Sequence, residues 1–343
     1  MTPATTLEYD LAFHGDPAGM PAFAREVEER GNVRGLFVSE ASHDAFVALT
    51  LAAVNSSTVQ IGTSIALAFA RSPMAMAYPA YDLQRLSEGR LVLGLGSQIK
   101  PHITRRYNMP WSRPAARMAE YVAALRAIWH TFQTGDKLDF RGEFYSHTLM
   151  PPLFNPGPLP TPSPEIYVAA VGPRMVETTG EVADGFMAHP LLSRSYLEKA
   201  LLPSLDAGRQ RGSRMEEPFT VSVMAMVATG RTEESLAAAI EGTRRQIGFY
   251  ASTPAYKTVL DHHGWGDLHD EAHTLTLTNR WGELAALIDD EVLHTLAVVG
   301  ELDEVGRGLR ERFDGLADRV MLSIPYDADE ALGLDIVTAA RDR

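Results

Sequence analysis

Residues 165–186 read EIYVAAVGPRMVETTGEVADGF. The apolar run at 166–170 has the length and composition of a buried parallel strand. Gly172 and Pro173 end that strand, and the residues up to Gly180 read as a short helix with proline in its first turn. A strand, a glycine turn and a helix N-terminus present backbone N–H groups and the positive end of a helix dipole. This arrangement suits a phosphate group, although it is also an ordinary turn in α/β folds.

The alternation of apolar runs with helical patterns extends along the whole chain. Residues 21–30 and 46–54 read as helices, and the stretch 72–87 begins with Ser72 as N-cap and a proline in the first turn. Eight apolar runs read as strands, at residues 7–13, 35–39, 59–69, 91–95, 166–170, 185–188, 219–228 and 320–323. Eight strands alternating with helices predict an α/β fold, the (β/α)8 TIM barrel, with an open doubly wound sheet as the alternative.

Two long segments interrupt this alternation. Residues 134–164, after the fourth strand and its helix, contain seven prolines between positions 151 and 164. Residues 252–292, after the seventh strand and its helix, include a stretch that is rich in His, Gly and Trp and has no clean period. Loops of this length are uncommon in a compact domain unless they are functional. We therefore expect one domain, residues 1–343, with two insertions, the second lying over the active face.

The composition argues against several classes of protein. The chain of 343 residues has no cysteine, which excludes disulfides, thiolate metal sites and thiol nucleophiles. Its 31 basic and 44 acidic residues give a net charge of −13, which argues against nucleic acid as a partner, because nucleic acid binding needs a basic surface. No apolar run reaches the roughly 18 residues of a membrane helix, and the first ten residues have no signal-peptide pattern. We expect a cytoplasmic protein that acts on a small molecule and does not associate with a membrane.

The stretch 165–186 resembles the luciferase-like flavin and deazaflavin oxidoreductases, whose fifth strand and following helix hold the cofactor phosphate. Four further blocks are similar to this family in the same order, namely RLVLGLGSQ at 90–98, MPWSRPAARMAEYVAALRAIW at 109–129, FRGEFY at 140–145 and ADRV at 317–320. The GSQ ending and the MPWSRPAARM block resemble the branch that uses the deazaflavin coenzyme F420. The resemblance implies a TIM barrel and a homodimer, and two-fold pairs are also the commonest oligomers.

The resemblance also implies a set of cofactor-binding residues. The third strand of the family carries a cis peptide bond behind the flavin-like ring, which falls here on Ser64–Ile65. Gly62, inside the same strand, independently indicates a bulge or a close approach of another backbone. Polar side chains after the fourth strand are placed to bind polar groups of the cofactor. The expected cofactor-binding residues are Glu40, Ser64, Ile65, Gly96, Ser97, Gln98, His102, Val171, Gly172, Pro173, Arg174 and Met175.

Hydride transfer requires little acid–base apparatus from the protein, because the cofactor carries the difficult chemistry. The sugar-phosphate dehydrogenase branch of the family has an acidic residue and a histidine side by side after strand two, and a glutamate after strand four. This chain matches only the acid, as Glu40, with Ala41 and Ile99 at the other two positions. Sugar-phosphate oxidation is therefore in doubt. We nominate Glu40 and His43 as catalytic residues, with His43 as proton donor or acceptor; His43 also fits an ordinary helix start beside Asp44.

Other chemistries fit the sequence less well. The stretch 94–97 lacks the third glycine of a dinucleotide-binding fingerprint. A metal-dependent hydrolase barrel would need His-x-His after strand one, where this chain has FHGD, so we expect no metal. A retaining glycosidase would need carboxylates after strands such as four and seven, where this chain reads GLGSQ and VATGRT. The predicted function is hydride transfer between coenzyme F420 and a small organic substrate. An FMN-dependent luciferase-like monooxygenase and a catalytically silent cofactor-binding barrel are the alternatives.

Overall fold

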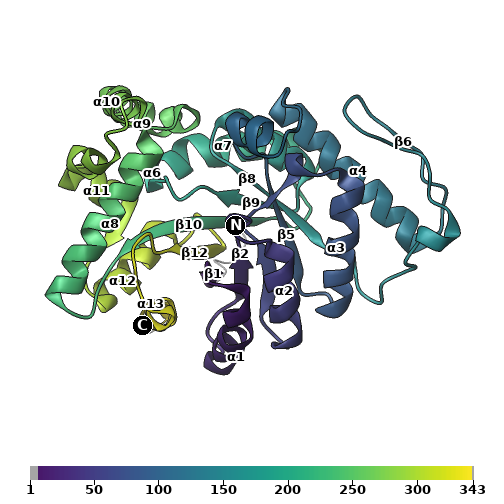
Figure 1. Cartoon of the computed structure of the whole chain (residues 1–343), viewed down its shortest axis with the longest axis horizontal. Helices are drawn as coiled ribbons and strands as arrows, with labels where there is room; N and C mark the ends of the chain where they lie inside the picture. The colour runs from purple at the N-terminus through teal and green to yellow at the C-terminus, as the bar shows by residue number, and fades with distance from the viewer. Residues whose placement is uncertain (1–6, 342–343) are drawn as a thin grey trace.

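The structure is a computed structural model that describes residues 7–341. Residues 1–6 lie outside the described residues, and they include part of the first ten residues to which the expectation about a signal peptide applied. The strands of the barrel are, in chain order, β1 (Glu8–Phe13), β2 (Gly35–Val38), β3 (Gln60–Thr63), β5 (Leu91–Gly96), β8 (Glu165–Ala170), β9 (Gly185–Ala188), β10 (Thr220–Ala228) and β12 (Arg319–Ser323). Neighbouring strands pair in parallel, and β1 closes the barrel by pairing with both β2 and β12 (Figure 1). The TIM barrel predicted from the sequence is confirmed, and the open sheet is not found.

The third predicted strand differs in detail from the prediction. The sequence reads as one continuous strand at 59–69, but the structure divides it into β3, β4 (Ala66–Leu67) and a 3-10 turn at Ala68–Ala70. The Ser64–Ile65 peptide bond between β3 and β4 is cis, as the family resemblance implied. Because β3 pairs with β2 and β5 while β4 pairs only with β5, the chain bulges at these two residues.

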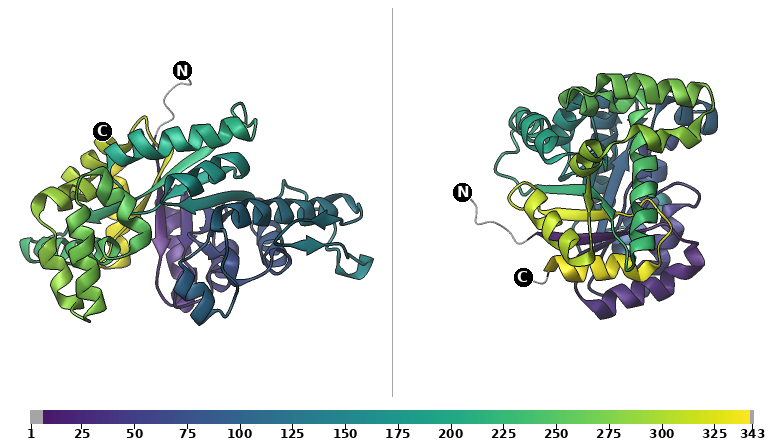
Figure 2. Two further views of the ribbon diagram at one scale, coloured as in Figure 1. Left: turned by 90° about the horizontal axis from the view of Figure 1, so that it is seen from above. Right: turned by 90° about the vertical axis from the view of Figure 1, so that its left-hand side faces the viewer.

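Helices cover the outside of the barrel (Figures 1 and 2). The main ones are α1 (Met20–Arg30), α2 (Ala45–Val54), α3 (Pro73–Leu86), α4 (Pro114–Thr134), α5 (Pro173–Val182), α7 (Leu202–Arg211), α8 (Glu233–Ala251), α12 (Leu302–Phe313) and α13 (Glu330–Arg341). Ser72 caps α3 by accepting a hydrogen bond from the N–H of Ala75 at 3.2 Å, as the sequence predicted. Among residues 7–341, no helix has both the length and the apolar character needed to cross a bilayer.

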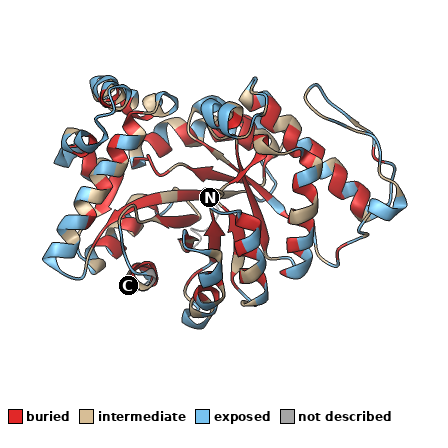
Figure 3. Cartoon of the chain, viewed as in Figure 1, coloured by how far each residue is buried: buried red, intermediate tan, exposed pale blue. Residues whose placement is uncertain are grey.

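Burial explains why the strands read as nearly continuous apolar runs. Every residue of β2, β5 and β9 is buried, as expected for parallel strands that are covered on both faces. Figure 3 shows the buried residues concentrated on the strands and on the inner sides of the helices. A separate cluster fills the barrel interior and contains Phe37, Val92, Tyr167, Met187 and Met321.

A buried ion pair lies inside the barrel toward the amino-terminal ends of its strands. Arg319 donates from Nε to Asp10 at 2.8 Å and from Nη1 to the Gln60 side chain at 2.6 Å. The side chains of Arg319 and Asp10 are 4% and 0% exposed. A Cβ at Gly35 would clash with this pair, so only glycine fits beside it. This end of the barrel is therefore filled.

The two insertions lie on opposite sides of the barrel (Figures 1 and 2). The first contains a small antiparallel hairpin, β6 (Phe140–Arg141) with β7 (Ser146–His147). The second, which shows no clean period in the sequence, forms regular structure. It contains α9 (Lys257–His262), α10 (Gly266–Leu277) and the start of α11 (Asp290–Leu296), and β11 (Ala297–Val299) follows it. The helices α9 and α10 are short and pack around a small local cluster, which explains why no long period is visible in the sequence.

Candidate active site

A cavity of about 1250 Å³ opens at the carboxyl-terminal ends of the barrel strands. Its lining includes residues directly after β1, β2, β5, β8, β9 and β12, together with α8 and the segment that follows it. Eight residues that the sequence nominated line the cavity, namely Ser64, Ile65, Gly96, Ser97, Gln98, Val171, Gly172 and Met175. The other five nominated residues do not line it, namely Glu40, His43, His102, Pro173 and Arg174.

The cavity wall formed by the bulge and β5 is closely packed. The N–H of Ser64 donates to the carbonyl of Val38 at 2.8 Å. Gly96 lies directly against Ile65, and a Cβ at position 96 would clash with the Ile65 side chain. Because no other side chain fits between them, the bulge and the end of β5 form one continuous wall with Ile65 on the cavity side.

Glu40 lies behind this wall. Its side chain is 7% exposed, accepts a hydrogen bond from the N–H of Leu67 at 2.9 Å, and pairs with Arg71. Burial raises the pKa of Glu40 above its ordinary value, while the contacts with Leu67 and Arg71 offset part of that rise. The backbone N–H of Glu40 donates to the carbonyl of Ile65 at 3.2 Å. Glu40 therefore holds the bulge from both sides without facing the cavity.

The two nominated histidines are exposed in the loops where the sequence placed them. His43 precedes α2, whose N-cap is Asp44; the Asp44 carboxylate accepts a hydrogen bond from the N–H of Phe46 at 2.8 Å. His102 begins a π-helical turn, His102–Arg106. The positions of both residues relative to the strands were predicted correctly, but the course of each loop leaves both rings outside the cavity lining.

The N-terminus of α5 opens into the cavity at Gly172. This N-cap residue provides no side chain for the first helical turn, and the space beside its Cα is open. The N–H of Met175 donates a hydrogen bond to the Gly172 carbonyl at 3.1 Å. Val176 also donates to this carbonyl at 3.2 Å and Pro173 has no N–H, so this terminus offers an anionic group the N–H of Arg174 and the positive end of the helix dipole. The side chains of Pro173 and Arg174 are exposed beside this terminus.

Three methionines form the floor of the cavity. Met187, Met224 and Met321 come from β9, β10 and β12, and Ala169 of β8 extends the same surface. Thioether side chains are polarizable and adaptable, and they contact aromatic rings favourably. The floor therefore suits a flat apolar group better than a charged one.

Two histidines that were not among the expected site residues line the cavity. His14 follows β1, and its Nδ1 lies 3.3 Å from the hydroxyl of Ser39. The His14 ring faces the cavity, and desolvation lowers the pKa of His14 below its ordinary value. His189 follows β9, and its Nδ1 accepts a hydrogen bond from the N–H of Leu191 at 3.1 Å. Their positions directly after predicted strands are the sequence signal that could have identified both.

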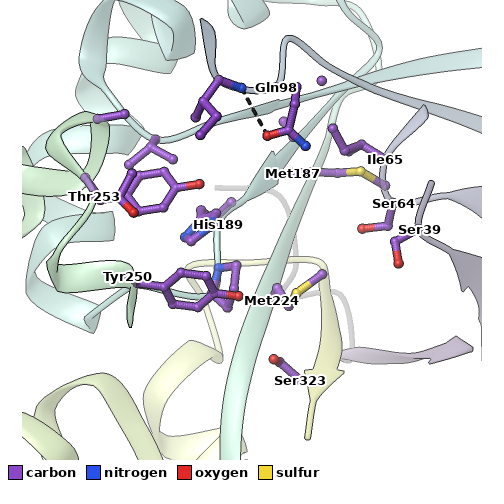
Figure 4. Close-up of a pocket in the computed structure, with 18 of the residues that line it drawn as sticks. Ser39, Ser64, Ile65, Gln98, Met187, His189, Met224, Tyr250, Thr253 and Ser323 are labelled. Carbon is purple, nitrogen blue, oxygen red and sulfur yellow. Dashed lines mark hydrogen bonds between the residues drawn. The ribbon is translucent and has the colours of Figure 1, made fainter. Parts of the chain in front are cut away.

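Two tyrosines surround His189. Tyr250 belongs to α8 and Tyr256 to the 3-10 turn Pro254–Tyr256, and their ring centroids lie 4.6 and 4.2 Å from that of His189. Figure 4 shows His189 and Tyr250 on one side of the cavity, facing Ser39, Ser64 and Ile65 on the other. No pattern in the sequence pointed to these tyrosines, because they reach the cavity from the helical segments after β10.

The lining suits an organic cofactor better than a metal ion. Within the part of the chain that the structure describes, no group of three or more His, Asp or Glu side chains is placed to hold a metal. The apolar floor, the polar side chains of Ser97 and Gln98, and the open N-terminus at Gly172 match a flat ring system with a polar edge and a phosphate.

Known proteins share this architecture. A coenzyme F420 dependent tetrahydromethanopterin reductase from Methanopyrus kandleri superposes with a TM-score of 0.79 at 18% identity over 97% of each chain. A second structure superposes with a TM-score of 0.67 at 16% identity over 98% of each chain. It is the oxygenating constituent of 3,6-diketocamphane monooxygenase from Pseudomonas putida in complex with FMN. At these identities the likeness concerns the fold.

Sequence relatives cover most of the chain. An uncharacterized protein of Mycobacterium tuberculosis is 52% identical over 293 residues, which is 85% of this chain and 86% of the relative. The 5,10-methylenetetrahydromethanopterin reductase of Archaeoglobus fulgidus is 23% identical over 302 residues, 86% of each chain. The family model described as luciferase-like monooxygenase matches residues 4–319. The chain therefore belongs to the luciferase-like monooxygenase family.

Proposed function

We propose that the protein is an oxidoreductase that transfers a hydride between coenzyme F420 and a small organic substrate. One observation carries the proposal, namely that a single cavity joins the bulge at Ile65, the Gly96 turn and the N-terminus of α5 at Gly172. The sequence blocks GSQ and MPWSRPAARM support F420 over FMN, because they resemble the F420-using branch. The bound coenzyme would supply a ring carbon that gives or accepts the hydride.

In this proposal the chain binds, orients and shields the cofactor. Ile65 and the methionine floor exclude water from the ring, and Ser97 and Gln98 bind its polar edge. The amides after Ala170 hold the phosphate, and the exposed guanidinium of Arg174 adds positive charge beside them.

Proton transfer is assigned to a different group from the one nominated by the sequence. Because His43 does not line the cavity, we propose that His14, hydrogen-bonded to Ser39, moves the substrate proton. Glu40 acts by holding the bulge through Leu67 and Ile65.

Cofactor titration tests the proposal. Purified protein should bind F420 with micromolar affinity and FMN much more weakly. The fluorescence of each cofactor reports its binding. The Gly172→Val variant should weaken F420 binding at least about tenfold, because its side chain would fill the open space where the phosphate is expected. Gly282→Val is the matched control, since Gly282 also has open space around its Cα and lies outside the cavity lining.

Each of the other outcomes points to a named alternative. Tighter binding of FMN than of F420 would support an FMN-dependent monooxygenase. Binding of F420 without turnover of a panel of ketones, alcohols and enones would support a silent cofactor-binding barrel. A loss of affinity in Gly282→Val equal to that in Gly172→Val would remove the assignment of the phosphate site.

A homodimer and a cytoplasmic location are further proposals, and the first rests on the family resemblance and on the commonness of two-fold pairs. Light scattering of the purified protein tests the first, since a monomer at working concentration would contradict it. Fractionation of the source cells tests the second.

A further inference from the structure

We propose that His189, Tyr250 and Tyr256 form a binding subsite for a flat, uncharged molecule that carries a hydrogen-bond acceptor. The donor to this acceptor is the Nε2–H of His189. The inference deepens the proposed function, since it names the substrate class that the same cavity would accept.

The tautomer of His189 follows from its hydrogen bond. The N–H of Leu191 donates to Nδ1 at 3.1 Å, so Nδ1 must be the unprotonated nitrogen. The proton of the neutral ring therefore resides on Nε2. Because His189 lines the cavity and Nδ1 is occupied by the main chain, Nε2 is the nitrogen that remains for a ligand.

The surroundings keep this donor neutral. Burial lowers the pKa of His189 to about 3 and raises that of Tyr256 to about 12, so neither ring carries a charge near neutral pH. The subsite therefore offers hydrogen bonds without the positive charge that a phosphate or carboxylate would require.

The two tyrosines give the subsite its shape. The ring of Tyr250 meets His189 edge to face, with an angle of 72° between the planes, and Tyr256 lies over His189 at 36°. The two tyrosine rings are themselves perpendicular, at 81°. Aromatic walls at such angles favour a flat ligand that contacts faces and edges.

Few charged side chains line the cavity. Of the residues that line the cavity, those with a fixed charge at neutral pH are Lys100, Arg245 and Asp327, and all three are exposed. Met224 makes the floor beside His189 apolar, whereas Met187, in β9, turns its side chain toward Gly94 and Ile65 (Figure 4). A ligand held by His189 therefore contacts neutral groups, and an anion would be desolvated without compensation.

Three probes of similar size test the inference. Acetophenone is flat and carries an acceptor, isopropylbenzene has a similar shape without one, and benzoate is anionic. Binding is followed by NMR of labelled methionine methyl groups, because Met224 lies at this end of the cavity. Acetophenone should bind about 3- to 10-fold more tightly than isopropylbenzene, which is the usual value of one hydrogen bond, and benzoate should bind most weakly.

Two substitutions identify the donor. His189→Phe keeps an aromatic ring and removes the donor, so the preference for acetophenone over isopropylbenzene should disappear. His189→Gln keeps an N–H donor and should retain most of the preference. Equal binding of the two neutral probes to the wild type, tightest binding of benzoate, no binding of any probe, or an unchanged preference in His189→Phe would each overturn the inference.

The titrations are made with and without bound F420, which separates this inference from the proposed function. If F420 binds but the probes show no selectivity, the subsite is wrong and the proposed function stands. If the selectivity is found and neither F420 nor FMN binds, the subsite stands and the proposed function fails.

Discussion

The carboxylate of Glu40 accepts a hydrogen bond from the backbone N–H of Leu67 at 2.9 Å. Glu40 follows β2 by two residues, whereas Leu67 lies in β4, on the far side of the bulge. The backbone N–H of Glu40 donates to Ile65 at 3.2 Å, within the bulge itself. One residue of a neighbouring loop therefore fixes the part of the wall that faces the proposed cofactor.

Replacing Glu40 should loosen this wall. Glu40→Ala leaves the buried N–H of Leu67 without its acceptor and Arg71 without its partner. We expect a loss of about 1–3 kcal/mol in the free energy of unfolding, measured with urea, and weaker F420 binding. Glu40→Gln keeps an acceptor and should lose less stability.

A surface ion pair provides the control for this substitution. Glu8 and Arg34 form an ion pair at 3.0 Å with both side chains more than 40% exposed. Glu8→Gln should therefore change stability by less than about 1 kcal/mol and leave F420 binding intact. If Glu40→Ala were as mild as this control, Glu40 would not hold the bulge.

The contact between Gly96 and Ile65 predicts a compensating pair of substitutions. Gly96→Ala places a methyl group where the end of the Ile65 side chain lies, and such overpacking costs about 1–3 kcal/mol. Ile65→Val removes the methyl group at that end and should recover part of the loss when the two changes are combined. A double-mutant cycle of unfolding free energies measures this coupling. Strict additivity of the two effects would contradict the packing described here.

The buried pair of Asp10 and Arg319 should be essential as a pair. Asp10→Asn leaves the Arg319 guanidinium buried, 4% exposed, without a countercharge, and should cost about 3–5 kcal/mol in the free energy of unfolding. The double variant Asp10→Leu with Arg319→Met removes both charges and should be clearly more stable than Asp10→Asn. Urea unfolding of the three proteins gives the comparison. If the double variant were the least stable of the three proteins, the attraction between Asp10 and Arg319 would stabilise the fold by more than the desolvation of the two charges costs.

The sequence predicted the barrel because its parallel strands are buried on both faces and therefore read as apolar runs. Gly172 was identifiable because a strand, a glycine and a helix start are consecutive along the chain. The side chains of His43 and His102 could not be placed, since the direction of a loop residue depends on contacts made elsewhere in the fold. Tyr256 was missed for a related reason, because it reaches His189 from a segment with no clear period.

The low pKa of His189 has a consequence for stability. In the unfolded chain a histidine titrates near pH 6.5, whereas burial lowers the pKa of His189 in the folded protein to about 3. As the pH falls below about 6.5, the unfolded chain takes up a proton that the folded protein excludes. Stability is therefore lost as the pH decreases from about 6.5 toward 3, with a slope from this group approaching about 1.4 kcal/mol per pH unit.

Substitutions at and near His189 test this consequence. Both His189→Phe and His189→Gln remove the imidazole, so their unfolding free energies should fall less steeply than that of the wild type between pH 6.5 and 5, by up to about 2 kcal/mol across the window. Tyr250→Phe alters the neighbouring ring but keeps the imidazole and should retain the steep slope. The measurement is urea unfolding at closely spaced pH values, with each slope compared within one protein. Parallel slopes for the wild type and His189→Phe would mean that His189 is protonated in the folded state as readily as in the unfolded chain, and its neutral Nε2–H donor would then be lost at mildly acidic pH.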